Sequence, residues 1–222
     1  MKNVGVIFDL DGVIVSTDDC HYQAWKQMAQ EEQIYFDRQI NERLRGVSRM
    51  ASLEIVLERA TKTYTQEQKI EMASRKNNYY IQLIENITPE DMLPGAHALL
   101  SSLKEAGIPI AIGSSSRNTP AILTHLGLFD FFDAVADGNC ITHSKPDPEV
   151  FTRAADGLHV SPSACLVVED ADAGIEAANR GGMISLGVGF ASQNMQADYR
   201  AVDLSALSVQ DVIYMLQKGK TV

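Results

Sequence analysis

Proline is absent from the first 88 of the 222 residues, since all seven prolines lie at or after Pro89. Between residues 17 and 87 the one glycine is Gly46. Because proline and glycine interrupt helices more strongly than other residues, their absence favours a helical segment over 17–87. Within it Trp25 and Met28 follow helical spacing, and Thr65 with Gln68 is typical of a capping box.

Cysteines and long apolar runs are also scarce. The three cysteines, Cys20, Cys140 and Cys165, are odd in number and far apart, which argues against a disulfide framework or a zinc knuckle. The first apolar run breaks at Asp9, which is too early for a signal peptide. No stretch approaches the roughly 18 apolar residues of a membrane span. We therefore expect a cytoplasmic protein that does not associate with membranes.

Positive charge is in deficit, with 19 Lys and Arg against 29 Asp and Glu and a formal net charge of −10. A chain of this balance is a poor partner for nucleic acid or an anionic membrane surface. If the substrate is anionic, positive charge has to be concentrated locally to bind it. We expect a small-molecule substrate, no nucleic acid and a monomeric protein.

From Pro89 onward, short apolar runs alternate with helical patterns, which predicts a parallel sheet covered by helices on both faces. The fold class is thus α/β, a doubly wound Rossmann-like core of residues 1–16 and 88–222, with 17–87 inserted as an all-helical domain. The predicted strands are 4–8, 108–113, 134–136, 165–168 and 184–188. The predicted helices of the core are 95–106, 118–126, 147–158 and 172–180.

The first predicted strand runs directly into two acids in "VGVIFDLDG", Asp9 and Asp11. Ligands of such sheets bind at the carboxyl ends of the strands, so these acids are predicted to line a ligand crevice. The alternative is a pair of solvated turn residues, since Asp-Gly is a common turn signal.

Other predicted strands end in residues of complementary chemistry. "SSSRN" (114–118) offers hydroxyls and backbone N–H groups that can bind phosphate, or it simply caps the next helix. Glu169 and Asp170 add a second acidic pair, or serve as a helix N-cap. Lys145 lies before Pro146, as an active-site cation or as a surface lysine. Carboxylates that converge favour a divalent cation, and oxygen ligands favour Mg²⁺.

Taken together, these motifs resemble those of the haloacid dehalogenase superfamily of phosphotransferases, in family order and across essentially the whole chain. "HYQAW" (21–25), "GVSR" (46–49), "RKN" (75–77) with Tyr80, and "SSSRN" resemble more closely the β-phosphoglucomutase subfamily, which carries a helical cap domain. In that subfamily Asp-Thr often stands where this chain has Ser16-Thr17, at the exit from the core to the cap.

The resemblance implies a role for each strand-end residue. Asp9 would be the nucleophile that becomes an aspartyl phosphate, and Asp11 the general acid and base. Ser114 and Lys145 would hold the transferring phosphoryl group. Mg²⁺ would be the cofactor, and its expected ligands are Asp9, the main-chain carbonyl of Asp11, Glu169 (directly or from the second shell) and Asp170.

It also implies a substrate site shared by cap and core. Arg49, together with Ser116, Arg117 and Asn118, would hold the second, non-reacting phosphate. His21, Lys76 and Tyr80 would form a network that steers Asp11 as the cap closes. The full expected substrate-binding set is Thr17, His21, Trp25, Gly46, Val47, Ser48, Arg49, Ser52, Lys76, Ser115, Ser116, Arg117 and Asn118.

The predicted activity is the interconversion of β-glucose 1-phosphate and glucose 6-phosphate through an aspartyl-phosphate enzyme and β-glucose 1,6-bisphosphate. A Mg²⁺-dependent phosphatase of small sugar phosphates is the main alternative, because it would use the same reacting residues. A phospho-receiver module also pairs acids with a lysine, but it needs no inserted helical domain. A catalytically inactive binding protein would not need an intact set of Asp9, Asp11, Ser114, Lys145 and Asp170.

Overall fold

The computed structural model describes residues 4–220, and its contacts divide the chain into two compact units. The first unit, called the core unit below, takes in the chain up to Ser16 and from Thr88 onward. The second, called the helical unit, is Thr17–Ile87. Each unit is described by itself.

The core unit is built on a six-stranded parallel sheet in the order β3-β2-β1-β4-β5-β6. Strand β1 lies between β2 and β4, so the strand order reverses beside it, and this is where ligands bind in open parallel sheets. The predicted parallel α/β fold is confirmed. The strands are β1 (Gly5–Phe8), β2 (Ile110–Gly113), β3 (Ala134–Ala136), β4 (Cys165–Glu169), β5 (Ile184–Gly187) and β6 (Tyr199–Arg200).

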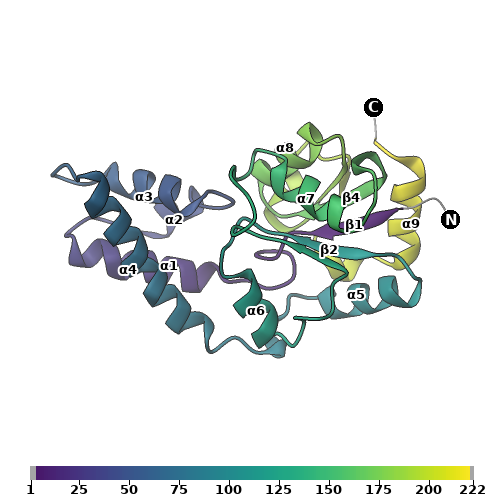
Figure 1. Cartoon of the computed structure of the whole chain (residues 1–222), viewed down its shortest axis with the longest axis horizontal. Helices are drawn as coiled ribbons and strands as arrows, with labels where there is room; N and C mark the ends of the chain where they lie inside the picture. The colour runs from purple at the N-terminus through teal and green to yellow at the C-terminus, as the bar shows by residue number, and fades with distance from the viewer. Residues whose placement is uncertain (1–3, 221–222) are drawn as a thin grey trace. The chain divides into compact units, whose positions relative to one another are not determined.

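Helices cover both faces of this sheet, with α7 and α8 on one side of the strands and α5 and α9 on the other (Figure 1). The core helices are α5 (Ala96–Glu105), α6 (Thr119–His125), α7 (Glu149–Gly157), α8 (Asp172–Arg180) and α9 (Val209–Lys218). Short 3₁₀ turns add η1 (Pro89–Asp91), η2 (Pro162–Ala164), η3 (Gly189–Gln193) and η4 (Leu204–Ala206). Four of the five helices occur where the sequence predicts them.

In the core unit, helix α9 and strand β6 are the α-helix and the β-strand that the sequence analysis missed. Ser208 and Asp211 form a reciprocal capping box at the start of α9, a signal that is present in the sequence as "SVQD". Strand β6 has only two residues, and a segment this short has no detectable periodicity.

Apolar packing fixes the sheet between its two layers of helices. Ile7 of β1 lies in register with Ala111 of β2 and Val167 of β4, so all three point to one face. They share a buried cluster with Phe151 of α7 and Ala177 of α8. Each large apolar side chain buried in this way contributes about 1.5–3 kcal/mol, so the strand ends are held in fixed relative positions.

The helical unit contains four helices, and residues 17–87 include no strand, as the sequence predicts. A buried cluster that includes Trp25, Met28, Leu53, Val56 and Met72 forms its centre. The helices are α1 (Asp18–Glu31), α2 (Arg38–Glu42), α3 (Arg49–Leu57) and α4 (Gln66–Ile84).

The predicted capping box at the start of α4 is present. The backbone N–H of Gln68 donates to Thr65 Oγ1 (3.3 Å), and the backbone N–H of Thr65 donates to Gln68 Oε1 (2.8 Å). Within residues 4–220, no helix is both long enough and apolar enough to cross a lipid bilayer.

Candidate active site

Asp9 leaves β1 at the edge of the sheet where the neighbouring strands also end. Phe8 pairs with Ile112 of β2 and with Val168 of β4, and the backbone N–H of Asp9 donates to the Val168 carbonyl (2.9 Å). The residues that follow β2 and β4 therefore emerge beside Asp9. This is the placement that a parallel topology dictates for strand-end side chains.

Three buried carboxylates converge at this edge. Oxygen atoms of Asp9, Glu169 and Asp170 all lie within 4.8 Å of one another, and each residue is less than a tenth exposed. Lys145 completes the cluster, because its Nζ donates to Asp9 Oδ1 (2.6 Å) and to Glu169 Oε2 (2.7 Å). Four residues singled out in the sequence thus form one contact network, although the chain separates Asp9 from Lys145 by 136 positions.

Burial and neighbouring charges shift the pKa values of this cluster in opposite directions. Burial disfavours the charged ammonium of Lys145, but the carboxylates of Asp9 and Glu169 outweigh that effect and raise its pKa. Burial raises the pKa of Glu169 to about 7, while Lys145 acts to lower it. Lys145 is therefore a cation at neutral pH, held between two acids.

Two glycines leave the space that the acids occupy. A Cβ atom at Gly12, where φ is +84°, would lie 2.1 Å from Asp170 Oδ2. A Cβ atom at Gly174, in the first turn of α8, would lie 2.0 Å from the carboxyl carbon of Glu169. Glu169 Oε1 also accepts the backbone N–H groups of Asp170 (3.1 Å) and Ala171 (3.0 Å), which fixes its orientation.

Asp11 lies in a tight turn that follows β1. The backbone N–H of Gly12 donates to the Val15 carbonyl (2.7 Å), and those of Ile14 and Val15 donate to the Leu10 carbonyl (3.0 and 3.2 Å). These bonds close the turn around Asp11, which is partly exposed, whereas Asp9 is buried. Ser16, the last residue of the core unit before Thr17, is exposed.

The carboxylate cluster has the chemistry of a magnesium site. Its three acidic residues offer only carboxylate oxygen atoms as metal ligands. One lysine lies beside these three carboxylates, so it cannot balance the negative charge of all of them. A divalent cation would relieve the remaining repulsion, and an all-oxygen donor set favours Mg²⁺. The residues present therefore fit the predicted metal.

A second group of possible ligand atoms, His143, Asp147 and Glu149, is of a different kind. Glu149 Oε2 already accepts the backbone N–H groups of Thr142 and His143 (2.8 Å each), and Arg153 pairs with Oε1. The His143 side chain is 70% exposed. These contacts tie the loop at Thr142 and His143 to the first residue of α7 and describe a structural role.

The loop after β2 carries the predicted phosphate contacts. Ser114 is buried, and its Oγ accepts the backbone N–H of Ser116 (3.2 Å). Ser116 Oγ in turn accepts the backbone N–H of Asn118 (3.2 Å), and Thr119 Oγ1 donates to the Ser116 carbonyl (2.9 Å). Ser115 Oγ is buried with no hydrogen-bond partner among residues 4–220. The loop is thus internally ordered beside Asp9.

In the helical unit, five predicted site residues lie in contact. Lys76 Nζ lies 2.8 Å from His21 Nδ1 and 5.0 Å from the centre of the Trp25 ring. The rings of His21 and Tyr80 are 4.2 Å apart, and Tyr80 Oη donates to Thr17 Oγ1 (3.1 Å). Burial, reinforced by the positive charges of Lys76, Arg49 and Arg45, holds the pKa of His21 well below its usual value.

The "GVSR" segment forms the entry to α3. Arg49 is the first residue of that helix, and Ser48 caps it by accepting the Ala51 backbone N–H (3.4 Å). Gly46 has a φ of +68°, and the buried Ser52 hydroxyl donates to the Val47 carbonyl (3.4 Å). These bonds fix the backbone that presents Arg49.

Arg45 is a residue that the sequence analysis missed. It pairs with Asp18 and Glu42, and its side chain is only 17% exposed. Its position directly before "GVSR" was the signal that could have indicated its importance. Its partner Asp18 lies 27 positions away in the chain, so the pairing itself could not be read from the spacing. Arg45 therefore anchors this segment to the start of α1.

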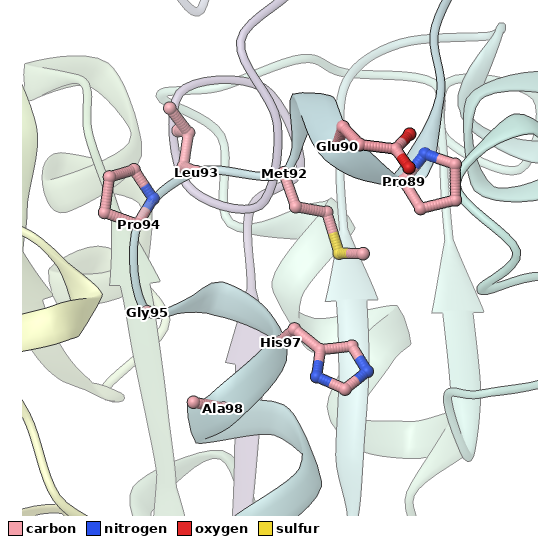
Figure 2. A pocket seen from close by; sticks show the side chains of 8 residues that line it. All are labelled: Pro89, Glu90, Met92, Leu93, Pro94, Gly95, His97 and Ala98. Carbon is pink, nitrogen blue, oxygen red and sulfur yellow. The ribbon is translucent and has the colours of Figure 1, made fainter.

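The core unit also has a cavity of about 550 Å³ lined by residues between Pro89 and Ala98 (Figure 2). Its ionisable lining groups are Glu90 and His97, and neither lysine nor arginine is among the lining residues. It contains none of the predicted site residues and offers no permanent positive charge to a phosphate. The carboxylate cluster after β1 and β4 is the better candidate for the active site.

Comparison with known proteins assigns the class. The family model for haloacid dehalogenase-like hydrolases matches residues 4–182. The chain belongs to this family, as its motifs predict.

Individual proteins that resemble the chain include two β-phosphoglucomutases and a sugar-phosphate phosphatase. The chain is 46% identical over 207 residues to a β-phosphoglucomutase of Bacillus subtilis, with 92% of each chain covered. It resembles a crystal structure of β-phosphoglucomutase from Clostridium difficile with a TM-score of 0.92 and 40% identity, over 98% of each chain. It is also 32% identical to a fructose-1-phosphate phosphatase of Escherichia coli, over 84% of this chain and 97% of the relative.

Proposed function

We propose that the chain is a phosphomutase that interconverts β-glucose 1-phosphate and glucose 6-phosphate through β-glucose 1,6-bisphosphate. The identity of 46% to a β-phosphoglucomutase, which extends over 92% of the chain, carries this proposal. The buried cluster of Asp9, Lys145 and Glu169 supports it, because a phosphomutase needs a positioned nucleophile in a site of balanced charge.

In this proposal the aspartyl phosphate of Asp9 first transfers its phosphoryl group to the 6-hydroxyl of β-glucose 1-phosphate, while Asp11 takes the proton of that hydroxyl, which gives β-glucose 1,6-bisphosphate. After the bisphosphate has turned over, Asp9 attacks the phosphorus atom of the 1-phosphate, and the bond from phosphorus to the sugar oxygen breaks. Asp11 gives its proton to the departing sugar oxygen, so that glucose 6-phosphate leaves and the aspartyl phosphate is regenerated. Lys145 holds the Asp9 carboxylate through its 2.6 Å hydrogen bond, and with Ser114 it contacts the transferring phosphoryl group.

Mg²⁺ is the proposed cofactor, held by Asp9, the main-chain carbonyl of Asp11 and Asp170, with Glu169 beside them. When bound, it supplies positive charge to the phosphoryl oxygens. The mutual distances of 4.8 Å or less between oxygen atoms of Asp9, Glu169 and Asp170 support this assignment.

The second phosphate is assigned to Arg49, Ser116, Arg117 and Asn118, and the helical unit is proposed to act as the cap. The remaining proposed substrate contacts are Thr17, His21, Trp25, Gly46, Val47, Ser48, Ser52, Lys76 and Ser115. Contacts among His21, Lys76 and Tyr80 support their proposed role as one network. We further propose a cytoplasmic monomer that binds neither nucleic acid nor membrane.

The test is a product assay. The protein is incubated with β-glucose 1-phosphate, Mg²⁺ and a trace of β-glucose 1,6-bisphosphate, and both glucose 6-phosphate and free phosphate are measured. We expect glucose 6-phosphate to be the main product, and α-glucose 1-phosphate serves as the control substrate. Stoichiometric release of phosphate without isomerisation would favour the phosphatase activity instead.

A further inference from the structure

The loop after β3 packs directly on the predicted phosphate loop after β2. Gly113 at the end of β2 pairs with Ala136 at the end of β3, so the two loops start side by side. The backbone N–H of Gly138 donates to the Ser116 carbonyl (3.1 Å). A Cβ atom at Gly138 would lie only 2.4 Å from the Ser115 carbonyl oxygen, which shows how closely the two backbones approach.

Asn139 links these loops through its side chain. Its Nδ2 donates to the Arg117 carbonyl (3.0 Å) and to Asp137 Oδ2 (3.1 Å), while its backbone N–H donates to Asp137 Oδ1 (2.8 Å). Both side-chain contacts are with acceptors, so the amide NH₂ group rather than the amide oxygen has to face them. Asp137 is 8% exposed and holds Asn139 in this orientation.

The same loop aims the Arg117 side chain. Arg117 Nε donates to the Gly138 carbonyl (3.2 Å), which uses one of the five donors of the guanidinium group. Within residues 4–220, its two terminal nitrogens make no hydrogen bond. A guanidinium held at Nε and open at both terminal nitrogens is arranged for bidentate contact with a phosphate.

We propose that Asn139 is a positioning residue for the second-phosphate site. It fixes the main chain of Arg117 through the Arg117 carbonyl, while Gly138 fixes the side chain through Nε. This inference rests on the proposed mutase function, in which Arg117 contacts the non-reacting phosphate of the bisphosphate. Asn139 itself does not contact the reacting group, so its effect should appear in recognition of the second phosphate.

The test is a double-mutant cycle in the full chain, made of Asn139→Ala, Arg117→Ala and the double variant. Loss of the hydrogen bond from Asn139 should lower kcat/KM for isomerisation roughly 5- to 20-fold, mainly through a higher KM for β-glucose 1,6-bisphosphate. In the Arg117→Ala background, Asn139→Ala should cost less than about twofold, because the residue it positions is gone.

Phosphorylation of Asp9 by acetyl phosphate provides the second readout, because this donor has no second phosphate. Its rate should stay within about twofold of wild type in Asn139→Ala. Asn86→Ala is the matched control, since Asn86 is exposed and, among residues 4–220, its Nδ2 donates only a long hydrogen bond of 3.5 Å to the Leu83 carbonyl.

Each outcome has a definite meaning. Additive losses in the cycle, equal losses with both phosphoryl donors, or no loss in Asn139→Ala would overturn the role of Asn139 while leaving the mutase function intact. A wild-type protein that accepts phosphate from acetyl phosphate but does not isomerise β-glucose 1-phosphate would overturn both.

Discussion

Among residues 4–220 two lysines are almost completely buried, one in each unit, and they have different neighbours. Lys145 in the core unit is 6% exposed and Lys76 in the helical unit 3%. Both ammonium groups face an aromatic ring, at 4.5 Å from the centre of Phe151 and at 4.6 Å from that of Tyr80. Beyond that, Lys145 donates to two carboxylates, whereas Lys76 contacts the imidazole of His21.

The comparison shows two ways of compensating the cost of burying a cation. In the core unit the opposite charges of Asp9 and Glu169 do so, and they raise the pKa of Lys145. In the helical unit the neighbours include a neutral base and aromatic faces, and burial with nearby cations lowers the pKa of His21. The first arrangement fixes charges for chemistry, and the second keeps an imidazole uncharged beside cations.

Replacing the nucleophile should have the largest effect. Asp9→Asn replaces a charged partner of Lys145 by a neutral amide, which is a poor nucleophile and a weaker metal ligand. We expect isomerisation to fall by several orders of magnitude, since an essential covalent catalyst is lost. Steady-state turnover checks this, with intact-mass measurement of the phosphorylated enzyme beside it. Near-normal turnover would remove Asp9 from the proposed mechanism.

Removal of the metal should abolish activity through its proposed binding site, which lies in the core unit. The three carboxylates of the core cluster are proposed to hold Mg²⁺, so EDTA should abolish isomerisation and added Mg²⁺ should restore it. A turnover assay measures the loss and recovery of activity, and calorimetry measures the binding of Mg²⁺. Full activity in metal-free buffer would contradict the assigned site.

Substituting each lysine tests the comparison directly. Lys145→Met leaves two buried carboxylates without their cation, which should lower the free energy of unfolding by about 3–5 kcal/mol. Lys76→Met removes a cation whose contacts include aromatic rings and the His21 imidazole, which should cost about 1–2 kcal/mol. Urea unfolding of both variants without Mg²⁺ gives the two values. Equal losses would show that the two carboxylate partners of Lys145 do not distinguish its site from that of Lys76.

Arg49→Ala separates recognition of the second phosphate from chemistry at the first. Loss of a partly desolvated contact between guanidinium and phosphate should cost about 2–4 kcal/mol, or roughly 30- to 1000-fold in isomerisation. Phosphorylation of Asp9 by acetyl phosphate should be nearly unchanged. An equal loss in both rates would place Arg49 at the reacting centre or in the fold, and no loss in either would favour the phosphatase activity.

The smallest predicted effect is a dependence of stability on pH that arises from His21. Its pKa is lower in the folded than in the unfolded chain, where it is near 6.5, so the unfolded chain binds more protons in the window below that value. The contribution of His21 is full above pH 6.5 and is lost as the pH falls, by at most about 1.4 kcal/mol for each pH unit.

Unfolding free energies between pH 5 and 7.5 test this dependence. The His21→Gln variant should show a shallower slope than the wild type, because it lacks the titrating ring. Identical slopes would mean that His21 does not remain neutral when the chain folds. A matched substitution at His125, the partly exposed last residue of α6 in the core unit, provides the control.

Much of the fold was predictable from local signals. Alternating apolar runs and helical patterns predicted the parallel sheet, and the absence of proline predicted the helices of residues 17–87. The capping box of α9 was visible in "SVQD" but was not used, and the two residues of β6 carry no periodic signal. Parallel topology also explains why Asp9, Lys145, Glu169 and Asp170 could be expected at one edge of the sheet.

The contacts between these side chains could not be predicted from the sequence. Nothing in the spacing shows that Lys145 bridges Asp9 and Glu169, that Gly174 leaves space for Glu169, or that Asn139 holds Arg117. Such contacts join segments far apart in the chain, and they depend on strand order, register and loop direction.

The sequence by itself determined where the strands end and which residue types follow them, because periodicity and turn signals depend only on residues that are close together in the chain. It thereby determined the α/β class, the helical insertion and the chemistry available to the site. Only the tertiary structure decided which charges meet. The order β2-β1-β4 brings the strand ends together, and packing of α7 and α8 on the sheet buries Lys145 between two acids that would otherwise repel each other.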